Sequence, residues 1–82
     1  MLITTKEVLR DLKSQKKIVD RKIVHNIDKL EELVANLKGS WDADYAADIS
    51  ARTAIVASCI GEAEAINARI DYYTSLEELD ED

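Results

Sequence analysis

Apolar residues in the first half of the chain recur at alternating intervals of three and four positions. Lys16 and Asn26 are the polar members of this series. The series consists of Leu9, Leu12, Lys16, Val19, Ile23, Asn26, Leu30, Leu33 and Leu37. Its flanks are widened by Val8, Ile27 and Val34. This spacing is typical of a helix that packs on another helix along a coiled-coil-like seam, and it predicts a helix over about residues 5–38.

The ends of this helix carry ordinary start and stop signals. Thr4 or Thr5 can cap its first turn, where Glu7 complements the positive end of the helix dipole. Lys38 supplies a cation for the last turn, and Gly39 tolerates the left-handed backbone that often follows a helix. We therefore expect a turn over residues 39–41.

A second series with the same spacing fills the other half of the chain. Its members are Tyr45, Ile49, Arg52, Val56, Cys59, Ala63, Ile66, Ile70 and Tyr73. Ser40 or Asp42 can cap the helix that this series predicts, over about residues 42–76. Acidic residues at the end of a helix oppose its dipole, so we expect residues 77–82 to form a frayed acidic tail.

Together the two series predict an all-α fold in one domain over residues 1–82, a helix–turn–helix hairpin of two long antiparallel helices. With a tight turn near residue 40, facing residue numbers add up to about 79. Ile23 then faces Val56, and Leu12 faces Ile66. The same pairing places Asn26 beside Arg52, in a polar layer of the core that can define the register of the two helices.

Composition supports helices and indicates a partner. The 82 residues include two glycines, no proline and no phenylalanine, which argues against a sheet with its turns. Two helices of this size bury too little apolar surface to be very stable alone, and the single cysteine excludes an internal disulfide. We therefore expect the hairpin to dimerise into a four-helix bundle.

The charge is divided between the two halves. Residues 1–38 carry nine Lys and Arg against six Asp and Glu, whereas residues 39–82 carry two against eleven. The net charge of −6 argues against a nucleic-acid partner, because phosphates require a basic surface. No segment approaches the roughly 20 apolar residues of a membrane span. The first residues also lack the basic and apolar regions of an ordinary secretory signal peptide.

Residues able to support catalysis or metal binding are few. His25 is the single histidine, and neither another histidine nor a cysteine lies near it to complete a zinc site. Cys59 falls on the apolar seam, where cysteine behaves as a small hydrophobe. The acids that follow the turn, Asp42, Asp44 and Asp48, lack the glycine and the spacing of a calcium loop. We expect no metal, no cofactor and no enzymatic activity.

Two short motifs remain. Trp41-Asp42-Ala43 lies at the predicted turn, and Tyr73-Thr74-Ser75-Leu76-Glu77 lies at the end of the second helix. With the hairpin pattern, these motifs make the chain resemble the WXG superfamily, the early-secreted-antigen-like proteins of bacterial type VII secretion. The resemblance covers nearly the whole chain. Ala43 stands where that family has glycine, a departure that also fits the divergent helical proteins that accompany large LXG toxins.

The resemblance implies a function in protein export. Tyr73 and Glu77 would form the Tyr-x-x-x-Asp/Glu signal that the secretion ATPase reads, and the protein would be secreted without a signal peptide. Its partner would be a second copy, another helical hairpin or an LXG toxin domain, in an antiparallel dimer. Trp41 and Tyr73 are about 48 Å apart along one helix, so only such a dimer could combine them in a composite signal.

Other interpretations remain open. Trp41 could simply seal the end of the hairpin, and Tyr73 could be a core residue of the apolar seam. The chain would then be a cytoplasmic adaptor or chaperone that is not exported. A third class, an acidic inhibitor or a DNA mimic, is supported by the charge alone.

Overall fold

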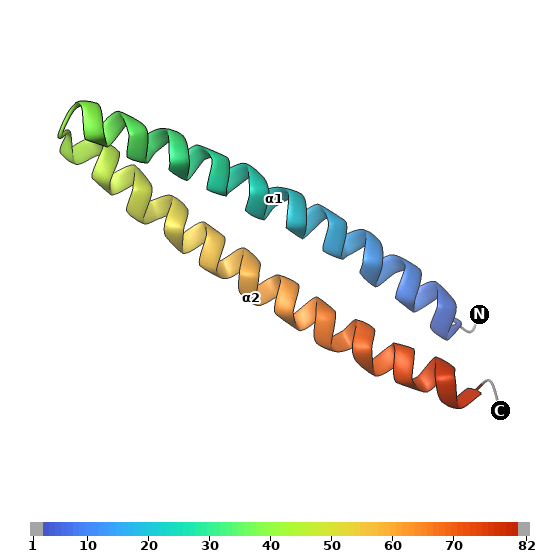
Figure 1. Cartoon of the computed structure of the whole chain (residues 1–82). Helices are drawn as coiled ribbons and strands as arrows, with labels where there is room; N and C mark the ends of the chain where they lie inside the picture. Colours follow the sequence, from blue (N-terminus) through green and yellow to red (C-terminus); the bar gives the residue numbers. More distant parts are fainter. Residues whose placement is uncertain (1–2, 81–82) are drawn as a thin grey trace.

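The protein is a hairpin of two long helices. The computed structural model describes residues 3–80, in which α1 spans Thr5–Gly39 and α2 spans Ala43–Asp80. The helices lie side by side, and the start of α1 and the end of α2 lie at the same end of the rod (Figure 1). The rod measures 62 × 18 × 17 Å. The described residues contain no strand, and the predicted helical hairpin is confirmed.

The start of α1 is capped by Thr4. Its backbone is extended, with φ −78° and ψ 156°, and its hydroxyl oxygen accepts a hydrogen bond from the Glu7 N–H at 3.1 Å. Its carbonyl oxygen accepts from the Val8 N–H at 3.1 Å. Thr4 rather than Thr5 therefore satisfies the free backbone donors of the first turn.

The connection between the helices is one residue later than the sequence predicts. Gly39 is the last residue of α1, and neither glycine has a positive φ, so the expected left-handed stop is wrong. The chain leaves the helix through Ser40, whose backbone is extended at φ −155° and ψ 105°. The Ser40 N–H still donates to the Asn36 carbonyl at 3.0 Å. An extended residue turns the chain here, and left-handed geometry is not needed.

Asp42 caps the second helix. Its side chain accepts a hydrogen bond from the Asp44 N–H at 2.8 Å, and its carbonyl accepts from the Ala46 N–H at 3.4 Å. Of the two expected caps, Ser40 and Asp42, the aspartate has the capping geometry. Its carboxylate also lies at the positive end of the helix dipole, which adds to the stability of the first turn.

We expect Asp42→Ala to lower the free energy of unfolding by about 1 kcal/mol, because the first turn loses a cap. Urea unfolding followed by circular dichroism measures this change. Ser40→Ala is the matched control, since the Ser40 side chain forms no capping bond, and its effect should stay within about 0.5 kcal/mol. Equal losses in the two variants would contradict the assignment of the cap.

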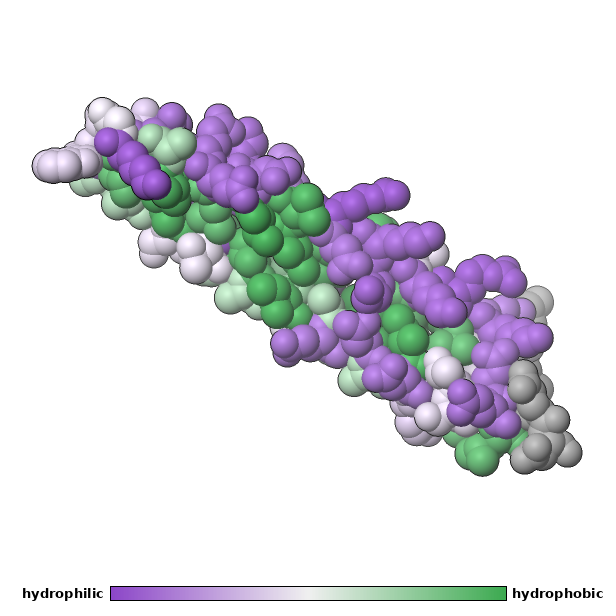
Figure 2. Space-filling model, in the orientation of Figure 1, coloured by the Kyte–Doolittle hydropathy of each residue, from purple (hydrophilic) through white to green (hydrophobic). Residues whose placement is uncertain are grey.

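The core is a single narrow seam between the helices. A continuous cluster of buried side chains fills its middle: Leu12, Val19, Cys59, Ala63 and Ile66. The half-buried Val8, Ile23, Ile70 and Tyr73 pack against this cluster. Outside the seam, apolar side chains reach the surface, where they lie between hydrophilic ones (Figure 2). The hairpin therefore buries one row of side chains from each helix and leaves other apolar residues uncovered.

The second helix is longer than expected. It continues to Asp80, beyond the predicted end near residue 76. Leu76 and Glu77 are half-buried, and Glu77 lies in a groove with Leu9 from the start of α1. These contacts with the neighbouring helix support the last turns in spite of the unfavourable dipole. Residues 81–82 of the predicted acidic tail lie outside the described part of the chain.

Candidate functional site

The structure brings Asn26 and Arg52 together across the seam. The Arg52 guanidinium donates a hydrogen bond to Asn26 Oδ1 at 2.8 Å. The Asn26 amide nitrogen donates to the Lys22 carbonyl at 2.7 Å, so both ends of the buried amide have a partner. A buried amide that is hydrogen-bonded at both ends avoids the cost of desolvation, and this layer is compatible with a stable seam.

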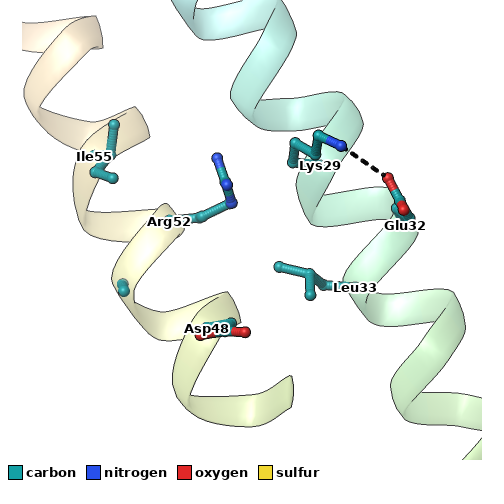
Figure 3. Close-up of a pocket in the computed structure, with 7 residues that line it drawn as sticks. Lys29, Glu32, Leu33, Asp48, Arg52 and Ile55 are labelled. Carbon is teal, nitrogen blue, oxygen red and sulfur yellow. Dashed lines mark hydrogen bonds and ion pairs between the residues drawn. The ribbon is translucent and has the colours of Figure 1, made fainter. Parts of the chain in front are cut away.

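Arg52 also borders an open groove between the helices, which Figure 3 shows from the side. Within this groove Lys29 forms an ion pair with Glu32 at 3.4 Å. The groove is lined by Lys29, Glu32, Leu33, Asp48, Ala51, Arg52 and Ile55. Charges of both signs occur along it, and no buried side-chain polar atom in residues 3–80 is left without a hydrogen bond. These features are those of a solvated edge of the seam.

Tyr73, the first residue of the predicted export signal, is partly a core residue. It is half-buried and packs against the buried cluster of the seam. Its ring contacts that of Tyr72 edge to face, with centroids 5.2 Å apart and planes at 80°. Tyr72 is 60% exposed and was missed by the sequence analysis. Tyr72 is an aromatic residue that does not belong to the apolar series, and this position could have identified it as an exposed aromatic side chain.

Glu77, the second residue of that signal, lies among cations. It shares a groove at the open end of the hairpin with Lys6, Arg10 and Lys13 of α1. The ion pairs found in residues 3–80 both lie within α1, so Glu77 is held in a positive environment without a direct pair. Tyr73 and Glu77 are four residues apart on one helix, which places them on the same side of α2.

The turn motif is divided among three structural roles. Trp41 is part of the short connection between α1 and α2. Its side chain is 92% exposed, so it does not seal the end of the hairpin. Asp42 is the cap of α2, and Ala43 is its first residue. Because Trp41 is at the turn and Tyr73 and Glu77 are near the open end, one chain does not bring the two motifs together (Figure 1).

Residues with catalytic potential are not gathered in the described region. Within residues 3–80, no three His, Cys, Asp or Glu side chains are placed to hold a metal ion. Cys59 is buried in the seam, whereas His25 is exposed on α1. Neither helix in this region contains a stretch long and apolar enough to cross a bilayer. The surface features that remain are the exposed indole of Trp41 and the exposed apolar side chains outside the seam.

Comparison of the chain with protein families, with curated proteins and with solved structures finds no match. The functional argument therefore depends on the residues and geometry described above.

Proposed function

We propose that this chain is a small, non-enzymatic protein of a type VII secretion system, either exported itself or acting as the export partner of a larger LXG-type toxin. The observation that carries the proposal is the 92% exposure of Trp41 at the tip of the hairpin. A large aromatic side chain that covers nothing within its own chain is well suited to contact another protein. A turn tryptophan in a helical hairpin is also the feature on which the resemblance to the WXG superfamily depends.

The proposed export signal consists of Tyr73 and Glu77. The half-buried tyrosine holds its ring in a defined position against the seam, and the acid is one helical turn away on the same side. A receptor such as the secretion ATPase could then read a rigid pair of side chains at the open end. The hairpin would be present in the cytoplasm before export and would leave the cell without cleavage of a signal peptide.

We expect Glu77→Ala to abolish release from a host that carries the secretion apparatus, because the acidic half of the signal is removed. Glu78→Ala is the matched control, since Glu78 is an exposed glutamate one position further along the chain. This variant protein should be released normally. Immunoblotting of medium and cells measures release, and circular dichroism verifies that both variants stay helical. Normal release of the Glu77 variant would disprove the signal.

Tyr73 requires a different comparison, because its replacement also removes packing from the seam. Tyr73→Phe keeps the ring and loses the hydroxyl group, whereas Tyr73→Ala loses both. If recognition uses the aromatic ring, Tyr73→Phe is released and Tyr73→Ala is retained at a temperature where both remain folded.

A second candidate function is that of an adaptor or chaperone that stays in the cytoplasm. The observation that favours it is the set of apolar side chains left uncovered outside the seam, which fits a helical partner of any kind. Wild-type protein that remains in the cells of a secretion-competent host would favour this function. Neighbouring genes for a secretion ATPase or an LXG toxin would favour export.

A further inference from the structure

The two sides of the seam differ in chemistry. The residues that directly precede the seam positions Leu30, Ile49 and Val56 line the groove of Figure 3: Lys29, Asp48 and Ile55. In an antiparallel pair of helices, the residues that directly follow seam positions lie on the side of the seam opposite to those that directly precede them. These include Ile27, Val34 and Ile60, each of which follows a seam residue. We call this opposite side the back face.

The half of the back face nearest the turn is the more apolar of the two halves. On α1 it exposes Ile27, Val34 and Val24, which are 39%, 40% and 58% exposed. On α2 it exposes Ile60, at 42%, and a row of small side chains. The small residues are Ala46, Ser50, Thr53 and Ala57. Asp20, Glu31 and Lys38 also follow seam residues and are the charged residues of α1 on this half, and small side chains on α2 allow another helix to approach closely.

The other half of the back face is charged, with opposite signs on the two helices. On α1 the helical spacing places Arg10, Lys13 and Lys17 in one basic row, and on α2 it places Glu64 and Asp71 in an acidic row. The groove that Lys6, Arg10 and Lys13 form with Glu77 verifies that these cations border α2 on one side of the molecule.

Two ways of stacking the back face on itself can be compared. A two-fold axis along the rod sets α1 of one copy on α2 of the other, with the two turns side by side. Apolar halves then cover apolar halves, and basic rows meet acidic rows. The Asn26–Arg52 contact fixes how the two helices are aligned along the rod. In this alignment Lys13 and Glu64 lie at about the same position along the rod axis.

A two-fold axis across the rod reverses one copy instead. When the two rods overlap along their full length, the apolar half of each copy would cover the charged half of the other, and α1 would lie on α1. Exposed charges would lose water without gaining an opposite partner, which is unfavourable. We infer that the back face binds a second copy of this chain in the parallel arrangement, with the two turns at the same end.

This inference rests on the partner that the proposed function requires, and it identifies that partner as the chain itself. Dimer formation is measured on the purified chain, so its failure can be distinguished from a failure of export. In the parallel dimer both Trp41 side chains lie at one end and both Tyr73–Glu77 pairs at the other. A composite signal of Trp41 from one copy and Tyr73 from the other is not formed, and each end of the dimer would present a duplicated motif.

The first test is self-association of the full chain, measured by light scattering over a series of concentrations. We expect a dimer for the wild type, and a dissociation constant at least about tenfold weaker for Ile60→Lys, because two lysines enter the interface. Ile55→Lys is the matched control, an isoleucine of similar exposure on the same helix but on the groove side. A monomeric wild type, or equal losses in the two variants, would overturn the proposal.

The second test determines the direction of pairing. A spin label on Ser40→Cys, in a Cys59→Ala background, reports the distance between the two turns. The parallel dimer predicts a distance below about 25 Å, since packed helices lie about 8–10 Å apart and the labels add their tethers. A fully overlapping antiparallel dimer places the labels about 54 Å apart, for some 36 residues of helix. That longer distance would refute the parallel arrangement, whatever the result of the export experiment.

Discussion

Ile66→Ala is expected to lower the free energy of unfolding by about 2–5 kcal/mol. Ile66 is 4% exposed and belongs to the buried cluster of the seam with Leu12 and Val19. The substitution removes buried methyl groups and leaves a cavity that long helices cannot easily close. Domains of this size have a total stability on the order of 4–12 kcal/mol, so this single change removes a large share of it.

Urea unfolding followed by circular dichroism measures this loss as a lower midpoint of the transition. Ile55→Ala is the matched control, because Ile55 lies on the same helix and is 47% exposed. Its effect should be within about 0.5 kcal/mol, since little apolar surface is buried there and alanine favours the helix. Equal shifts in the two variants would show that the seam does not lie where the structure places it.

The second large effect is expected in the polar layer. Asn26→Ala should cost about 1–3 kcal/mol, because the partly buried Arg52 guanidinium loses the oxygen to which it donates. Removing both partners together, as Asn26→Leu with Arg52→Leu, should cost far less and could stabilise the hairpin. The cost arises from an unmatched polar group rather than from loss of the hydrogen bond itself.

A double-mutant cycle of Asn26→Ala and Arg52→Ala measures the coupling between these residues. We expect a coupling energy of at least about 0.5 kcal/mol, as is usual for residues in direct contact. Additive effects of the two substitutions would show that the hydrogen bond contributes nothing to stability.

Most of the fold follows from the spacing of apolar residues. The two three-and-four series predict helices over about residues 5–38 and 42–76, and the structure has Thr5–Gly39 and Ala43–Asp80. The same spacing anticipates the contact of Asn26 with Arg52, because a short turn leaves little freedom in how antiparallel helices align. Helical hairpins are favourable cases for such reasoning, since one seam determines both the elements and their register.

The details of the ends depend on contacts that the sequence pattern does not contain. Gly39 predicts a left-handed stop, but the extended Ser40 turns the chain instead. The acids after Tyr73 predict fraying, but α2 extends further, where Glu77 lies beside the basic side chains of α1. Both differences arise because a helix end responds to its neighbour as well as to its own residues.

The exposure of Trp41 makes the protein its own fluorescent probe. An indole that is 92% exposed is already surrounded by water in the folded chain, so its emission should hardly change when the helices melt. A blue shift should appear only when another molecule excludes solvent from the tip of the hairpin. Emission from this single tryptophan therefore distinguishes occupancy of the turn from unfolding, without any added dye.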